Sequence, residues 1–251
     1  MFAATPPTLQ PPAVMAHRYF VDHLPEPGPT TLDGELAHHL GRVLRSRPGE
    51  EVVLGDGRGG TARATIAAVG RDRVELQVAE VHHEAPTAPT VLLAFAPPRQ
   101  QRGEWLFEHG TEVGVAVFQP LWTQRTRPQG ERPERWAKVV RAAAGQCDRA
   151  WLPAVKPALE FAAFLQQPGL PAARWLATAN APPLRDQLGA STASSTQAVL
   201  LVGPEGGFTA DEQAAAAAAG FRPCGLGPHI LRTETAALVG AAMLLAAAGG
   251  D

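Results

Sequence analysis

The sequence predicts an α/β protein with a mainly parallel sheet covered by helices on both faces, preceded by a small β-rich domain. From residue 85 onward, continuous apolar runs of strand length alternate with helical segments, a pattern typical of parallel strands buried on both faces. Residues 17–84 instead carry short strand-like segments at regular spacing, which indicates a small barrel. The proline-punctuated segment 82–90 (HHEAPTAPT) separates the two patterns. We therefore expect a tail at 1–16 and domains at 17–84 and 85–251.

In the N-terminal domain, the predicted strands are RYFVDHL, EEVVLGD, TARATIAAV and RVELQVAEV. One helix interrupts them at 33–49, because Leu36, Leu40, Val43 and Leu44 form an apolar face at helical spacing. The opening 16 residues have no basic n-region and are broken by prolines. We expect a disordered tail there rather than a signal peptide or a membrane span.

In the C-terminal domain, VLLAFAP and VAVFQPLWT are predicted strands, and EWLFEHGTEVG and PERWAKVVRAAAGQCDR are predicted helices. The segments LEFAAFLQQ, RWLATAN, PLRDQLG and AVLLVGPEGG continue the alternation of strands and helices. Ligands of such open sheets bind at the loops that leave the carboxyl ends of the strands. The GPEGG segment lies at one of these ends.

The last apolar run covers residues 236–248 and is too short for a membrane span, which needs roughly twenty residues. A helix that is apolar all round must be buried. It is expected either inside one monomer or between two subunits. Gly240, Ala241 and Ala242 would permit a close approach of helices, which favours a homodimer.

Composition narrows the possible functions. The net charge of −2 and the pI near 6.5 exclude a global basic field, so any nucleic-acid site must be a local patch. Cys147 and Cys224 form no CxxC pattern, so we expect no metal site, no disulfide and a cytoplasmic location. Nearly all the positive charge is arginine, which suits RNA binding but equally fits a coding bias.

A local basic patch occurs in the N-terminal domain. His38, Arg42 and Arg45 share one face of the predicted helix, and Arg47 follows just beyond it. Acidic residues outnumber basic ones in this domain, so the patch is a local exception, and phosphate contacts need only such an exception. We predict RNA contact here. A merely solvated helix face is the alternative.

The GPEGG segment (203–207) is only partly explained by local structure. Thr209 and Glu212 predict a capping box for the following helix, and Gly220 predicts its end. The bare backbone of residues 203–206 remains to be explained and would allow a ligand to approach closely. No lysine is near, so a phosphate-binding Walker loop is excluded. An acid would repel a polyphosphate but tolerate a cation such as the sulfonium of S-adenosylmethionine.

A second glycine-proline turn leads to RTET (232–235) at the start of the last helix. Thr233 or Thr235 can cap this helix, and Glu234 suits its first turn. Arg232 is unfavourable near a helix N-terminus, so we expect an anionic partner for it, either Glu234 or a ligand.

The succession of LLVGPEGGFTADE and LGPHILRTETAAL resembles the 16S ribosomal RNA (uracil-N3) methyltransferases, the RsmE type of the SPOUT superfamily. HLGRVLRSRPGE, EWLFEHGTEVGV and GQCDRAWLP are similar to further segments of the same family, so the resemblance covers nearly all of residues 17–248. It implies a PUA-like barrel followed by a SPOUT domain that is tied in a deep trefoil knot. It also implies bound S-adenosylmethionine, a homodimer, and methylation of one uridine in small-subunit ribosomal RNA, free or in an assembled subunit.

By position, the resemblance implies a cofactor pocket formed by Thr178, Gly203, Pro204, Glu205, Gly206, Leu226, Gly227, Ile230, Leu231 and Thr235. The catalytic hypothesis comes from the chemistry, because N3 of uridine must lose its proton and the anionic base must be stabilised. We expect Arg232 to face the uracil carbonyl oxygens and Glu234 to orient Arg232 or take the proton of N3; an internal Arg232–Glu234 pair is the alternative. The expected RNA contacts are Arg18, His38, Arg42, Arg45, Arg47, Gln146 and Arg149.

The chain departs from the family pattern at several positions. Gly145 stands where a glutamate is usual, His229 where arginine is common, and His109 where lysine is common. The segment PPRQQRGE also lacks the lysine that is typical there. These departures affect the expected RNA contacts more than the cofactor site. Two alternatives therefore stay open: a catalytically silent RNA-binding protein on the same fold, or a SPOUT enzyme that methylates a different RNA position.

Overall fold

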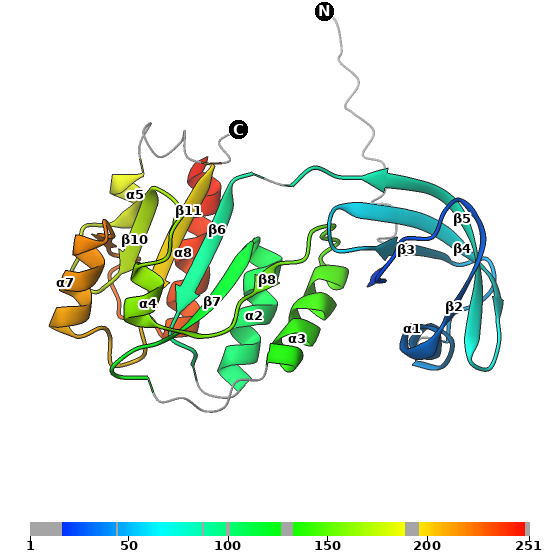
Figure 1. The fold of residues 1–251 in the computed structure, drawn as a ribbon, viewed down its shortest axis with the longest axis horizontal. Helices are drawn as coiled ribbons and strands as arrows, with labels where there is room; N and C mark the ends of the chain where they lie inside the picture. The colour runs from blue at the N-terminus through cyan, green and yellow to red at the C-terminus, as the bar shows by residue number, and fades with distance from the viewer. Residues whose placement is uncertain are drawn as a thin grey trace, which may run out of the picture. The chain divides into compact units, whose positions relative to one another are not determined.

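The computed structural model describes residues 17–43, 45–86, 88–98, 101–126, 133–188 and 196–248, so the expected tail at 1–16 lies outside the described residues. The chain divides into two compact units. Unit 1 contains the chain up to Glu84 together with Asp148–Ala150, and unit 2 contains Ala85–Cys147 and the chain from Trp151 onward. Each unit is described by itself below (Figure 1).

Unit 1 is built on a five-stranded sheet in the order β1-β3-β4-β5-β2. β1 pairs in parallel with β3, and the other neighbours are antiparallel. Alternate residues of the strands, such as Leu54, Ile66 and Leu76, face a buried core. The bounds are β1 Arg18–Phe20, β2 Gly28–Asp33, β3 Glu51–Gly55, β4 Gly60–Val69 and β5 Arg73–His83.

The helix predicted at 33–49 is shorter and irregular. It starts as α1 (Gly34–His38) and continues as the π-helical turn η1 (His39–Val43). Leu40 is fully buried and Leu36 is half-buried, as the apolar spacing predicts. The side chain of Val43 and the whole of Leu44 lie outside the described residues.

Unit 2 contains a parallel sheet, which confirms the predicted fold class. Its strands follow the order β12-β10-β11-β6-β7-β8, with β9 paired to β7, and every pairing is parallel. The bounds are β6 Thr90–Phe95, β7 Val117–Trp122, β8 Ala154–Val155, β9 Leu159–Glu160, β10 Ala173–Ala177, β11 Gln197–Val202 and β12 Arg222–Cys224.

Helices cover both faces of this sheet (Figure 1). Successive residues of β11 show the division: Leu200 belongs to a core cluster with residues of α2, α3, α5 and α8, whereas Leu201 belongs to a cluster with residues of α4 and α7. The apolar strands are thus buried on both sides, as their continuous runs predict. The bounds are α2 Gln101–Val113, α3 Pro133–Gln146, α4 Phe161–Leu165, α5 Leu184–Gln187, α7 Ala210–Ala218 and α8 Thr233–Ala248.

The last helix packs closely on the sheet. Ala237, Ala241 and Leu244 are buried, and a Cβ added to Gly240 would stand 2.6 Å from a methyl group of Leu200. Gly240 therefore lets α8 approach its own sheet. Among the described residues, no helix is both long and apolar enough to cross a membrane. The trefoil knot stays a prediction.

Candidate functional site

Three loops at the carboxyl edge of the unit 2 sheet enclose a cavity of about 560 Å³. They are the loops that follow β10, β11 and β12, and residues 177–181, 202–208 and 225–231 line the cavity together with Gln213, Thr233 and Ala236. Backbone hydrogen bonds join the loops after β10 and β12, from Thr178 N to the Cys224 carbonyl (3.0 Å) and from Gly225 N to the Pro182 carbonyl (2.9 Å). Parallel strands place these loops side by side, because their carboxyl ends share one edge.

The cavity contains most of the predicted cofactor residues. Its lining includes Thr178, residues 203–206, Leu226, Gly227, Ile230 and Leu231. Thr235 is absent from the lining, and Thr233 is present instead. The Thr233 hydroxyl donates a hydrogen bond to the Gly203 carbonyl (2.9 Å), which ties the start of α8 to the loop after β11. Thr233 is therefore the threonine of RTET that belongs to the cavity wall.

Two glycines of the cavity wall are required by close contacts. A Cβ on Gly225 would stand 2.6 Å from the Ala181 carbonyl oxygen, which is backbone and cannot swing aside. A Cβ on Gly203 would stand 3.0 Å from the Phe208 ring. The wall thus packs against main chain at Gly225 and against an aromatic ring at Gly203, and neither position has room for a side chain.

The charged side chains of the cavity wall agree with the prediction that its ligand is not a polyphosphate. Glu205 and His229 are the titratable side chains of the lining, both are exposed, and no lysine or arginine occurs among the described residues that line it. A polyphosphate would normally be held by cationic side chains. This wall is better suited to a neutral or positively charged ligand.

The loop after β7 supports the GPEGG segment from outside. The Arg125 guanidinium donates a hydrogen bond to the Gly206 carbonyl, and the Gln124 backbone N–H donates to the Glu212 carboxylate (2.8 Å). Glu212 also completes the predicted capping box with Thr209, which is confirmed. Neither contact was predictable from the sequence, because nothing local to Arg125 indicates which loop it meets.

The predicted catalytic pair has an unexpected geometry. Arg232 is exposed and lies between Leu231 and Thr233, which both line the cavity. Glu234 is 7% exposed, and its Oε1 lies 3.7 Å from Nε of Arg102 in the first turn of α2. The ion pair found for Glu234 is therefore with Arg102, and no Arg232–Glu234 pair is present. Sequence reasoning missed Arg102, although a cation in the first turn of a helix is a signal of the same kind as Arg232.

The basic patch of unit 1 is exposed. His38, Arg42, Arg45 and Arg47 all face solvent, and none of them makes an ion pair with another described residue. Arginines of the strands, in contrast, form ion pairs: Arg63 lies 3.8 Å from Glu80, and Arg73 lies 3.8 Å from Glu75. The charges of the patch are therefore available to an external anion.

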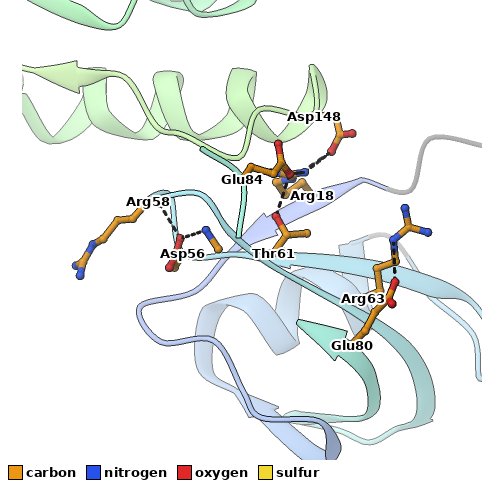
Figure 2. Close-up of polar contacts among 9 residues, drawn as sticks. Arg18, Asp56, Arg58, Thr61, Arg63, Glu80, Glu84 and Asp148 are labelled. Carbon is orange, nitrogen blue, oxygen red and sulfur yellow. Dashed lines mark hydrogen bonds and ion pairs between the residues drawn. The ribbon is translucent and has the colours of Figure 1, made fainter. Parts of the chain in front are cut away.

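Arg18 does not fit the expected RNA contact. Its side chain is 4% exposed, with Nη2 at 3.0 Å from Asp148 and 3.4 Å from Glu84 (Figure 2). This guanidinium is held between two carboxylates inside unit 1 and is not accessible to RNA. Gln146 is exposed at the end of α3, and Arg149 is half-buried.

The described residues show neither a metal site nor a reactive buried cysteine. No cluster of three or more histidine, cysteine, aspartate or glutamate side chains with the spacing of a metal site occurs in the described ranges. Burial raises the pKa of the Cys224 thiol to about 12, so this thiol stays protonated at neutral pH.

Comparison with known proteins places the chain in a family. Residues 84–245 match the model of an RNA methyltransferase domain, and residues 32–79 match that of an RNA methyltransferase PUA domain. The ribosomal RNA small subunit methyltransferase E of Synechocystis sp. is 36% identical over 92% of this chain and 78% of its own length. The protein of the same name from Mycobacterium bovis is 34% identical over 90% of each chain.

Solved structures agree with the fold. A methyltransferase of Legionella pneumophila with the bound cofactor S-adenosylmethionine has a TM-score of 0.84 and 28% identity, over 93% of this chain and 98% of its own. The ribosomal RNA small subunit methyltransferase E of Neisseria gonorrhoeae, bound to S-adenosylmethionine, has a TM-score of 0.81 and 29% identity, over 90% and 95%. The parallel sheet, the N-terminal PUA domain and these relatives together show that the chain belongs to the ribosomal RNA small subunit methyltransferase E family.

Proposed function

We propose that this chain transfers a methyl group from S-adenosylmethionine to N3 of one uridine in small-subunit ribosomal RNA. The observation that carries the proposal is the cavity at the carboxyl edge of the unit 2 sheet. Its volume of about 560 Å³ is typical of a site for a small cofactor. Its wall of bare glycine backbone without a cationic side chain suits an adenosyl group that carries a sulfonium.

The reaction is a displacement at the methyl carbon. The carbon–sulfur bond of the sulfonium breaks, a carbon–nitrogen bond to N3 forms, and the sulfur leaves as a neutral thioether. The proton of N3 must also leave, and it passes to solvent water. Loss of this proton places negative charge on the uracil oxygens, so a fixed cation beside them lowers the barrier. Arg232 is the candidate for this role, because it is exposed between two residues of the cavity wall.

A direct test measures cofactor binding and the modified nucleoside separately. We expect calorimetry to detect S-adenosylmethionine binding, and nucleoside mass spectrometry to find N3-methyluridine after incubation with unmodified small subunits. Binding without any product would favour a silent RNA-binding protein. A different methylated nucleoside would favour a SPOUT enzyme with another target. Arg232→Ala should lower turnover by about 10²-fold or more without loss of cofactor binding, and unchanged turnover would remove Arg232 from catalysis.

The RNA is proposed to contact the patch formed by His38, Arg42, Arg45 and Arg47. Support comes from the exposure of these side chains and from the absence of carboxylate partners within the described residues. Replacing the three arginines with alanine should weaken RNA binding and lower the salt dependence of the affinity by about 0.7–0.9 per lost phosphate contact. The matched control is Arg63→Ala, which removes an exposed arginine that is paired with Glu80. Equal affinities in both variants would exclude the patch.

We also propose a cytoplasmic homodimer in which α8 contributes to the interface. Thr235, Val239, Ala242 and Ala246 follow helical spacing, carry no charge and are exposed or half-buried. Gly240 and Ala241 do not support this interface, because they are buried inside unit 2. Light scattering after chromatography should give a dimer for the wild-type chain and a monomer for Ala242→Glu. An unchanged dimer would place the interface elsewhere.

A further inference from the structure

Glu234 is a buried carboxylate with one oxygen that has no partner. It is the second residue of α8, it is 7% exposed, and its Oε2 is inaccessible and accepts no hydrogen bond from any described residue. Among the residues that the structure describes, its Oε1 is paired with Arg102 alone, whose Nε lies at 3.7 Å. An ionised carboxylate in such a place is costly unless a cation holds it. Among the described residues, Arg102 is therefore the cation that offsets the cost of burying the Glu234 carboxylate.

Arg102 has no structural reason of its own to stand at the start of a helix. It is the second residue of α2, where the helix dipole disfavours a cation. The acid of the same turn, Glu104, forms a bidentate pair with Arg135 and is not available to Arg102. The contact with Glu234 explains why the position carries a cation, but it occupies only Nε.

The guanidinium of Arg102 thus has unused donors. Its side chain is 49% exposed, and within the described ranges Nη1 and Nη2 form no hydrogen bond or ion pair. Guanidinium is a planar fork, and the Glu234 carboxylate attracts its Nε side at 3.7 Å through charge, which leaves the two terminal nitrogens able to donate elsewhere. An arginine attracted to a buried acid has fewer accessible orientations than an isolated surface arginine, so it should lose less entropy when it binds an anion.

Arg102 stands at the same edge of the sheet as the cavity. Two neighbouring strands, β6 and β11, end together, because Ala96 N donates to the Val202 carbonyl (3.0 Å) just before α2 begins. The start of α8 is tied to the next residue, Gly203, through Thr233. Arg102 does not itself line the cavity. Arg102 is therefore near this edge of the sheet but outside the cavity wall, so it is not a cofactor contact.

We propose that Arg102 is a substrate-binding residue, and that Glu234 is the positioning residue that aims its terminal nitrogens at an anionic oxygen of the RNA. The anion is either a phosphate beside the target uridine or a uracil oxygen after N3 has lost its proton. This inference rests on the proposed function, and it changes the role of Glu234 from partner of Arg232 to holder of Arg102.

The test compares full-length Arg102→Ala, Arg102→Lys, Glu234→Gln and the double variant Arg102→Ala/Glu234→Gln with the wild-type chain. The control is Arg135→Ala, which breaks the other ion pair of α2. RNA affinity is measured at several salt concentrations, cofactor affinity by calorimetry, and kcat and KM on unmodified small subunits. We expect Arg102→Ala to bind S-adenosylmethionine like the wild type and to lose about tenfold or more in RNA affinity or in kcat.

The pattern of the loss separates the two anions. A phosphate contact raises KM and lowers the salt slope by about 0.7–0.9, with kcat retained. A uracil contact lowers kcat with the salt slope retained. In both cases Arg102→Lys restores part of the loss, Glu234→Gln shows the same kind of loss, and the double variant is no worse than Arg102→Ala.

Two results would overturn the inference. One is an Arg102→Ala variant that matches the wild type and Arg135→Ala in RNA affinity, salt slope and turnover. The other is a variant that loses cofactor binding and thermal stability together, since this would show a structural role only. If the wild-type chain modifies no RNA, the proposed function fails, but RNA affinity and its salt slope still test Arg102.

Discussion

The substitution Gly225→Ala tests whether the main chain of the loops after β10 and β12 shapes the cofactor cavity. The new Cβ would stand 2.6 Å from the Ala181 carbonyl oxygen, and ordinary contact begins near 3.4 Å, so the two segments must separate by about 0.8 Å. Both segments are backbone and are joined by hydrogen bonds from Gly225 N to Pro182 O and from Leu184 N to Gly225 O. Overpacking of this kind typically costs about 1–3 kcal/mol.

Gly225→Ala should therefore lower the melting temperature by on the order of 2–12 °C and weaken S-adenosylmethionine binding by about tenfold or more, which is about 1.4 kcal/mol. Thermal unfolding and calorimetry measure the two effects. The matched control is Gly207→Ala, which also lies on the cavity wall and has a positive φ of 69°, but has no heavy atom within 4 Å of the new Cβ. It should show backbone strain alone, about 1 kcal/mol. Cofactor affinity that is equal in the two variants would refute the steric reasoning.

Three further predictions concern buried polar groups. Glu212→Ala removes the capping box and leaves Gln124 N without its acceptor. Chemical denaturation should therefore show a free energy of unfolding lowered by about 2 kcal/mol or more. A loss below about 0.5 kcal/mol would contradict this. Thr233→Val removes the hydrogen bond to the Gly203 carbonyl. Calorimetry should show cofactor binding weakened by several-fold, about 1 kcal/mol. The control Thr235→Val, outside the cavity lining, should leave cofactor binding unchanged. Cys224 should resist alkylation at pH 9, where an ordinary thiol is largely reactive, because burial raises its pKa to about 12; peptide mass spectrometry of the native protein would expose a labelled Cys224 if the thiol were accessible.

The sequence predicted the elements that are determined by residues close together in the chain. The continuous apolar runs of β6, β7, β10 and β11 predict buried parallel strands, and the Thr209–Glu212 spacing predicts the capping box. Two of the three cavity loops follow from the glycine-proline turns at 203–207 and 225–228, whereas the loop after β10 contains no glycine. The strands β2 and β12 were missed, because GPTTLD and RPC contain glycine or proline and are too short for a periodic signal.

The errors concern contacts between residues that are distant in the chain. Arg18 was predicted to face RNA, but it pairs with Asp148, 130 residues away. Glu234 was predicted to orient Arg232 or to take the proton of N3, and the ion pair that it makes is with Arg102 on another helix. Which arginine is paired and which is exposed depends on where the chain brings carboxylates, and a single sequence carries no periodic pattern for that.

The segment Asp148–Ala150 has a practical consequence for work on the N-terminal unit. A fragment that stops at residue 84 would lack Asp148, which leaves the enclosed Arg18 guanidinium with a single carboxylate, and it would lack the Ala150 carbonyl that accepts from Gly59 N (3.2 Å). Truncation at the linker would thus remove one carboxylate from a buried charge and the acceptor from a peptide N–H. RNA affinity measured on such a fragment would report a damaged domain, so the patch is better studied by substitution in the whole protein.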